Sequence, residues 1–186
     1  MKLKRTVAGR MLALFCWGVS ASCFAGEQAD TLSLLFVGDL MQHQAQLDAA
    51  RREDGSFDYS GCFAEVSPEI MKADIAVGNL EVPLGGKPYT GYPAFSAPDE
   101  WLFALRDAGF DVFLAANNHC LDRGKKGLER TVGVFDSLKV WNAGIYRDSL
   151  DRADRYPLLI EKKGFRIAIL NYTYGTNGIK PQKEVI

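Results

Sequence analysis

Residues 32–39 read LSLLFVGD, an apolar run that ends in a glycine and an acid. A short apolar run bounded by a turn residue predicts a buried strand with Asp39 at its carboxyl end. The arrangement recurs twice, because residues 75–81 read IAVGNLE and residues 111–119 read DVFLAANNH. The sequence therefore predicts three buried strands, each followed at once by polar side chains.

Helical patterns lie between and after these strands. One helix is predicted after Pro98 and before Gly109, since proline suits a first turn and glycine a C-terminal stop. A second is predicted over residues 126–138. Their apolar faces are formed by Trp101, Leu102, Leu105 and Ala108 in the first, and by Leu128, Val132, Phe135 and Leu138 in the second.

The remaining segments complete an alternation of strands and helices. A short strand is predicted near Val140, and two more over residues 157–161 and 165–171, joined by the tight turn Lys162-Lys163-Gly164. This order predicts an α/β fold with a largely parallel, layered sheet in one domain. Residues 83–98 contain four prolines and three glycines and predict a long irregular loop, which is usually functional or mobile.

The N-terminus resembles a bacterial secretory signal. Four basic residues precede an apolar run at residues 11–19, and small residues follow. We expect residues 1–25 to be a signal peptide cleaved near Ala25, because the apolar run is short for a membrane anchor. The protein is then periplasmic or extracellular. Lipidation of Cys23, which would anchor it in a membrane, is the alternative.

Composition excludes some classes of protein. With 47% hydrophobic residues in 186, the chain has the composition of a globular domain. Without residues 1–25, 18 basic residues face 23 acidic ones, a balance of about −5, so we expect no nucleic-acid partner. That part of the chain keeps only Cys62 and Cys120, too few for a disulfide framework, although the two could still pair.

The polar residues after the strands form the candidate site, because ligands of open α/β sheets bind beyond the carboxyl ends of the strands. Carboxylate, amide and imidazole groups together suit a borderline divalent cation such as Zn²⁺, Mn²⁺ or Fe²⁺. The residues are Asp39, then Asn79 with Glu81, then Asn118 with His119, and Asp122 three positions later. Independent placement at three strand ends favours a shared site.

Each residue also has an ordinary structural interpretation. Asp39 could cap the following helix, and Glu81 could be a solvated loop charge. Asn118 could be a turn residue, and His119 a hydrogen-bonded structural histidine. His43 fits a solvated surface residue better than a member of the site.

Five longer motifs occur in order along the chain: GDLM at 38–41, GNLEVPLGG at 78–86, YPAFSAP at 92–98, GFDVFLAANNHCLDRGKKGLERT at 109–131 and LNYTYGTNG at 170–178. Together they resemble the CapA family of bacterial capsule and poly-γ-glutamate synthesis proteins. The resemblance covers nearly everything after residue 25. It implies the layered α/β sandwich of the calcineurin-like metallophosphoesterases, with a divalent metal at the strand ends.

The resemblance also implies roles for individual residues. Asp39, Asn79 and Asn118 become metal ligands, and His119 stabilises the transition state, with Glu81 as a further catalytic group. The chain departs from a typical phosphoesterase at two of these positions, since Met41 stands in place of a histidine and Asn79 in place of an acid. Glu81 compensates for the lost acid, or the site has another chemistry.

Other residues fill smaller roles in this interpretation. The segment at 170–178 offers Tyr172, Tyr174 and Asn177 as substrate-binding groups, although its glycines also suit an ordinary turn. Cys120 is expected to serve packing, because a sequence neighbour of His119 rarely forms a nucleophile–base pair with it.

The sequence supports three hypotheses about function. Members of the family continue into motifs containing further histidines, whereas this sequence holds only His43 and His119, so we expect the sandwich to lack its C-terminal part. The first hypothesis is an exported, metal-dependent hydrolase of a phosphoester or amide bond in capsule or poly-γ-glutamate metabolism, working beside membrane-associated biosynthesis machinery. The second is a non-catalytic envelope protein that binds or helps export an anionic polymer. The third is an inactive, aggregation-prone fragment.

Overall fold

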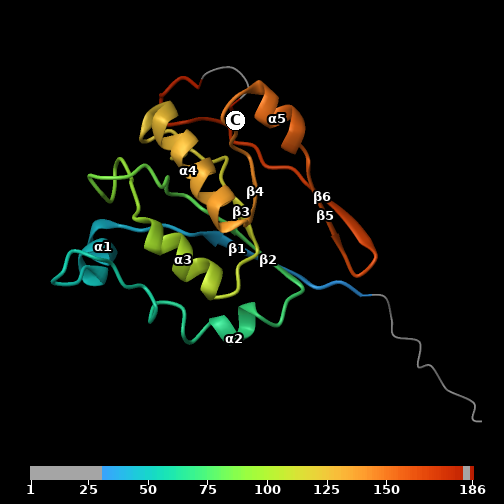
Figure 1. Cartoon of the computed structure of the whole chain (residues 1–186), viewed down its shortest axis with the longest axis horizontal. Helices are drawn as coiled ribbons and strands as arrows, with labels where there is room; N and C mark the ends of the chain where they lie inside the picture. The colour runs from blue at the N-terminus through green and yellow to red at the C-terminus, as the bar shows by residue number, and fades with distance from the viewer. Residues whose placement is uncertain (1–30, 182–184) are drawn as a thin grey trace, which may run out of the picture. The chain divides into compact units, whose positions relative to one another are not determined.

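Four parallel strands form the central sheet in the order β1-β2-β3-β4, which is also their order along the chain (Figure 1). The computed structural model describes residues 31–181 and 185–186. Because the strands run in one direction, their carboxyl ends share one edge of the sheet. The strands are β1 (Leu34–Asp39), β2 (Ile75–Asn79), β3 (Val112–Leu114) and β4 (Trp141–Ala143).

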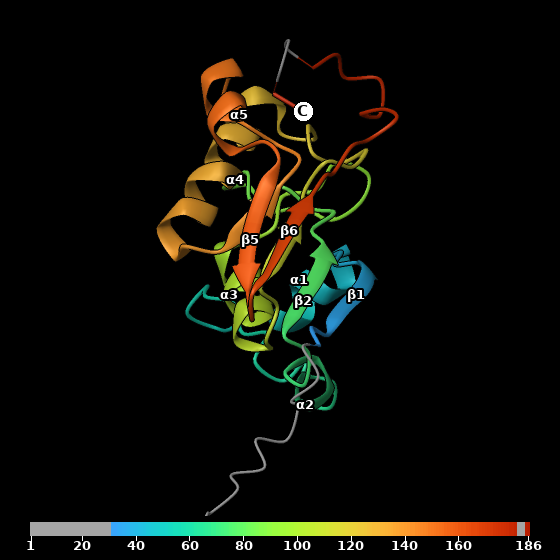
Figure 2. The same ribbon diagram turned by 90° about the vertical axis from the view of Figure 1, so that its right-hand side faces the viewer.

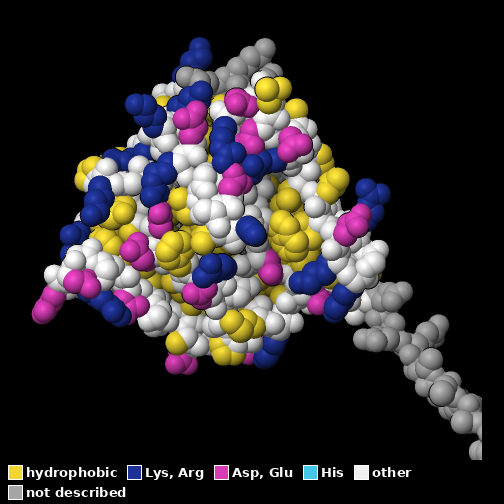
Figure 3. All heavy atoms as spheres, in the orientation of Figure 1, with side chains coloured by type: hydrophobic (Ala, Val, Ile, Leu, Met, Phe, Trp, Pro, Cys, Tyr) yellow, Lys and Arg dark blue, Asp and Glu magenta, His cyan; other side chains and the backbone are white. Residues whose placement is uncertain are grey.

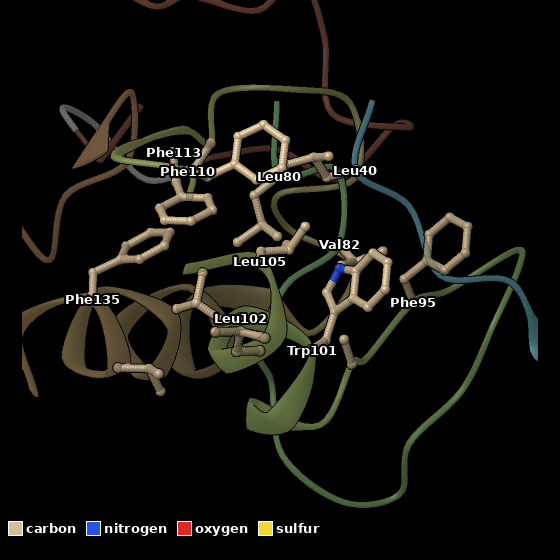
Figure 4. Packing of buried hydrophobic residues seen from close by; sticks show 14 of the residues in the cluster. Leu40, Leu80, Val82, Phe95, Trp101, Leu102, Leu105, Phe110, Phe113 and Phe135 are labelled. Carbon is tan, nitrogen blue, oxygen red and sulfur yellow. The ribbon is translucent and has the colours of Figure 1, made fainter. Parts of the chain in front are cut away.

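Helices cover one face of this sheet. The two predicted helices are present as α3 (Asp99–Asp107) and α4 (Gly124–Leu138). Their apolar faces join the main core with strand residues such as Phe113, whose ring stacks on that of Phe135 with centroids 6.1 Å apart (Figure 4). Shorter helices complete the set: α1 (Gln44–Ala50), α2 (Ser67–Ile70) and α5 (Ser149–Arg155).

An antiparallel hairpin covers part of the opposite face (Figure 2). It consists of β5 (Leu158–Lys162) and β6 (Phe165–Ile169). Lys163 and Gly164 at its turn both have positive φ, 50° and 79°, the backbone that lets two residues reverse a strand. Ile160 of β5 packs with Ile75, Val77 and Val112 in a second, smaller apolar cluster. The predicted layered α/β fold is therefore confirmed.

The predicted irregular loop at residues 83–98 packs against the body of the domain. Its one β-bridge joins Thr90 and Ser96, and Leu84 and Phe95 within it are wholly buried. The guanidinium of Arg130 on α4 donates to the carbonyl of Leu84 at 2.6 Å. The loop is thus a fixed wall of the site described below.

Charges of both signs intermingle on the face shown in Figure 3, where apolar side chains also gather beside the hairpin. Among the described residues, no helix is long and apolar enough to cross a membrane. Cys62 is exposed and Cys120 is buried in the main core, and both are free thiols. The expected signal segment, residues 1–25 with Cys23, lies outside the described residues.

Candidate functional site

The first part of the site is a carboxylate pair at the ends of β1 and β2. Asp39 and Asn79 are register partners across these strands. The Asn79 amide nitrogen donates to Asp39 Oδ1 at 2.8 Å and to Glu81 Oε2 at 2.9 Å. One amide group therefore holds two acids together, as the strand-end prediction requires.

Asn117 links this pair to the next loop. Its side-chain nitrogen donates to Asn79 Oδ1 at 3.2 Å and to the carbonyl of Leu80 at 2.9 Å, while its oxygen accepts from the backbone N–H of His119 at 3.1 Å. The strand-end pattern predicted Asn118 as a site residue, whereas in the structure Asn117 makes these contacts. The available signal was position, because Asn117 is the first polar residue after β3, and the structure buries it.

His119 is held by a buried carboxylate. Its Nδ1 lies 2.7 Å from Asp122 Oδ2, and the two side chains are only 7% and 4% exposed. The same oxygen accepts from the backbone N–H of Phe95 at 2.8 Å. A carboxylate only accepts, so Nδ1 carries the proton in this contact. The remaining ring nitrogen, Nε2, hydrogen-bonds to none of the described residues.

Asn177 enters the site from the C-terminal segment. Its side-chain oxygen accepts from the Asn118 side-chain nitrogen at 3.3 Å, and its side-chain nitrogen lies 3.2 Å from His119 Nδ1. Its positive φ of 50° is a conformation that asparagine tolerates better than most residues. The structure thus brings Asn118 and Asn177 together, next to the imidazole.

The two predicted substrate-binding tyrosines lie elsewhere. The hydroxyl of Tyr172 contacts that of Tyr156, and the Tyr174 side chain is fully exposed. Neither lines the cavity beside His119. Alternating residues of an extended segment point in opposite directions, so only part of the 170–178 motif can face the site.

The ordinary interpretations of Asp39 and Glu81 do not fit the structure. The N-cap of α1 is His43, so Asp39 caps no part of that helix. Glu81 is half-buried beside Asp39 rather than solvated. His43 itself is exposed, as expected, and its ring stacks beside Tyr92 with centroids 6.2 Å apart.

Burial and the neighbouring acid change the proton affinity of Glu81. Loss of hydration raises the pKa of its carboxyl to about 7, and the Asp39 carboxylate adds to the rise, while His119 and the Asn79 hydrogen bond oppose it. An acid with this pKa exchanges a proton near neutral pH, which general acid–base catalysis needs. Both causes of the raised pKa, burial and the neighbouring Asp39 carboxylate, therefore lie at the ends of β1 and β2.

A cavity of about 580 Å³ opens beside His119. Its walls come from the 83–98 loop, from the loop after β3 and from the C-terminal segment. The size suits a small molecule or a few units of a polymer. It is lined by Tyr92, Pro93, Ala94, Asn118, His119, Asp122, Asn177 and Ile179.

The donor set near Asp39 tests the predicted metal site. No group of three His, Cys, Asp or Glu side chains among residues 31–181 and 185–186 is arranged to hold a metal ion. Two carboxylates converge at Asp39 and Glu81, and carboxylate oxygens suit a hard or borderline cation. The Asn79 amide turns its nitrogen toward both acids and its oxygen toward Asn117, and Asn118 is engaged by Asn177. The carboxylate pair is therefore the part of the predicted ligand set that fits a cation in this arrangement.

The sequence is similar to known proteins over most of its length. A family model described as "Bacterial capsule synthesis protein PGA_cap" matches residues 33–185. The chain is 29% identical over 153 residues to the capsule biosynthesis protein CapA of Bacillus anthracis, covering 79% of this chain and 36% of that protein. It is 30% identical over 157 residues to the PGA biosynthesis protein CapA of Bacillus subtilis, covering 77% and 38%. The chain thus spans well under half the length of either relative.

Proposed function

Because the chain belongs to the family of bacterial capsule synthesis proteins, we propose that its site cleaves a phosphoester or amide bond during synthesis of an anionic envelope polymer. One observation carries this proposal. The Asn79 amide holds the Asp39 and Glu81 carboxylates together, and Asn117 ties that pair to the loop bearing His119. The carboxylate pair is thereby tied by hydrogen bonds to the backbone of the residue that carries the imidazole.

Each residue has a definite task in the proposed reaction. Asp39, with Glu81 beside it, would hold a divalent cation such as Mn²⁺, Zn²⁺ or Fe²⁺, and Asn79 would join them once its amide oxygen turned toward the cation. Such a cation polarises the scissile bond and lowers the pKa of a water molecule when it is bound. Glu81 would accept a proton from the attacking water as the scissile bond breaks and would return that proton to the leaving group. Asp122 keeps the proton of His119 on Nδ1 and so leaves Nε2 to interact with the substrate.

A second candidate is a non-catalytic protein that binds or helps export such a polymer. The orientation of Asn79 favours it, because its N–H groups already satisfy both carboxylates. A typical catalytic carboxylate cluster instead repels itself until a cation arrives. In either case we propose an exported protein that works beside membrane-associated biosynthesis machinery and has no nucleic-acid partner.

Metal content and hydrolysis of the purified full chain distinguish the two. We expect stoichiometric Mn²⁺ or Zn²⁺ by mass spectrometry of the metal, together with hydrolysis of a phosphodiester or a γ-glutamyl oligomer. Asp39→Ala should lose the metal, whereas His119→Ala should keep the metal and lose activity. Asp48→Ala, on the exposed surface of α1, is the matched control.

A folded chain that binds no metal and cleaves neither substrate would contradict the hydrolase proposal. Binding of a poly-γ-glutamate oligomer by that same chain would then support the second candidate. Loss of that binding in His119→Ala would locate it at the cavity.

A further inference from the structure

A second cavity lies between α3 and residues 57–68, the segment that leads into α2. Its volume is about 430 Å³, within the range of small-molecule sites, and it shares no lining residue with the cavity beside His119. In Figure 1 this segment and α3 lie on the side of the domain away from the hairpin. The cavity is lined by Phe57, Asp58, Tyr59, Ser60, Phe63, Ala64, Ser67, Pro68, Glu100, Phe103, Ala104, Asp107 and Ala108.

Aromatic rings form much of the wall of this cavity. Trp101 supports two of them, because its ring centroid lies 5.1 Å from that of Tyr59 and 5.5 Å from that of Phe63. Tyr59 is held further by its hydroxyl, which donates to Gln42 Oε1 at 2.7 Å. Phe103, across the cavity on α3, is 37% exposed. The wall is therefore a fixed aromatic surface with one ring open to solvent.

The charged side chains that line the cavity are all acidic. They are Asp58, Glu100 and Asp107. Asp58 pairs with Arg52, and Asp107 pairs with Arg106 at 2.7 Å, although neither arginine lines the cavity. Glu100 has no ion-pair partner among residues 31–181 and 185–186. Within the described part of the chain, one negative charge at the cavity is thus left without a counter-ion.

Glu100 also lies in the first turn of α3, where a negative charge stabilises the end of a helix. Asp99 already supplies such a charge in the same turn and pairs with Arg130 at 2.7 Å. Helix stabilisation accounts for an acid at this position. It does not account for the aromatic cavity that the acid lines.

We propose that this cavity, which we call the α3 pocket, binds a small organic cation with one positive charge and an apolar body. An amine or quaternary ammonium group is attracted by the faces of aromatic rings and by the unpaired carboxylate of Glu100. The apolar body covers Phe63 and Phe103 and removes their surface from water. Anions are excluded because the carboxylates of the pocket repel them. The site is separate from the strand ends and does not depend on the function proposed for them.

Titration of the full chain with benzyltrimethylammonium tests the α3 pocket. In ¹H–¹⁵N spectra the amides of residues 57–68 and of α3 should show saturable shifts, and that of His119 should show none. Phenylacetate, an anion of similar size, should leave all of them unshifted. Glu100→Gln keeps the size of the side chain, removes its charge and should weaken binding by about fivefold. Glu161→Gln, whose side chain is 76% exposed on the hairpin, is the matched control and should bind like the parent.

A second variant fills the cavity. Ala104 lines it and is only partly buried, so Ala104→Leu occupies part of the space with another good helix former and should abolish the saturable shifts. Circular dichroism and the melting temperature establish that each variant is folded. Equal binding by the parent and Glu100→Gln would overturn the proposal, as would equal binding of phenylacetate. A parent chain without saturable shifts, or with shifts centred on the cavity beside His119, would do the same.

Discussion

Replacing Asp122 with asparagine tests how His119 is held. The Asp122 carboxylate is 4% exposed and accepts from both the His119 ring and the backbone N–H of Phe95, at 2.7 and 2.8 Å. Both donors use the same oxygen, Oδ2, so the amide of asparagine either keeps the two contacts with a neutral oxygen or sets an N–H group against both donors. Either orientation removes the charge that strengthens both hydrogen bonds.

The cost follows from these two contacts. Hydrogen bonds to a charged group contribute about 1.5–3 kcal/mol, against about 0.5–1.5 kcal/mol for neutral ones, so making the acceptor of both bonds neutral should cost about 2 kcal/mol. For a domain of this size, each kcal/mol lowers the melting temperature by about 2–4 °C, so Asp122→Asn should melt about 6 °C below the parent. Asp107→Asn, which removes an exposed acid paired with Arg106, should cost less than about 1 kcal/mol.

The imidazole tautomer supplies a second readout that needs no activity. The sequence contains two histidines, so ¹⁵N spectra of the parent and of His43→Gln assign the His119 signals without further labelling. We expect the proton on Nδ1 in the parent and a shift of population toward Nε2 in Asp122→Asn. An unchanged melting temperature together with an unchanged tautomer would refute the argument that Asp122 positions His119.

Three further changes probe the walls of the site. Glu81→Gln should raise the melting temperature at pH 8 and have little effect at pH 4. Folding raises the pKa of the Glu81 carboxyl to about 7, so this group increasingly destabilises the fold as the pH rises from its pKa in the unfolded chain to above 7. An equal effect of the substitution at both pH values would contradict this origin. Phe95→Ala should lower the free energy of unfolding in urea by about 3–5 kcal/mol, because the ring is wholly buried. Tyr92→Ala, which changes an exposed residue of the same loop, should lower it by less than about 1 kcal/mol. Similar costs for the two variants would show that the loop is not packed as described. Gly91→Ala should cost about 1–3 kcal/mol, because the new Cβ would lie 2.3 Å from the backbone nitrogen of Gln44, and a neutral result in the same assay would mean that the loop and α1 are not in close contact.

Local pattern alone determined most of the architecture. Apolar runs and helical spacing predicted β1, β2, α3, α4 and the hairpin within a few residues, because these elements depend on contacts between near neighbours in the chain. The turn at Lys163 and Gly164 was also predicted from the sequence. The spacing of the apolar residues along such an element indicates which of its faces is buried.

Parallel topology also placed the right polar residues near each other. Asp39, Asn79 and Glu81 meet because the carboxyl ends of adjacent parallel strands share an edge. The sequence pattern did not predict how the Asn79 amide is oriented between the two acids. That orientation depends on Asn117, which sits 38 positions away in the chain.

Tertiary structure alone decided the rest of the site. Asp122 accepts hydrogen bonds from both the His119 ring and the backbone of Phe95. Asn177 contacts His119 although the two are 58 positions apart in the chain. Tyr172 and Tyr174 are exposed instead. Sequence period fixes which face a side chain occupies within its own element. Which distant side chain meets it there depends on how separate loops pack, and no local interaction encodes that.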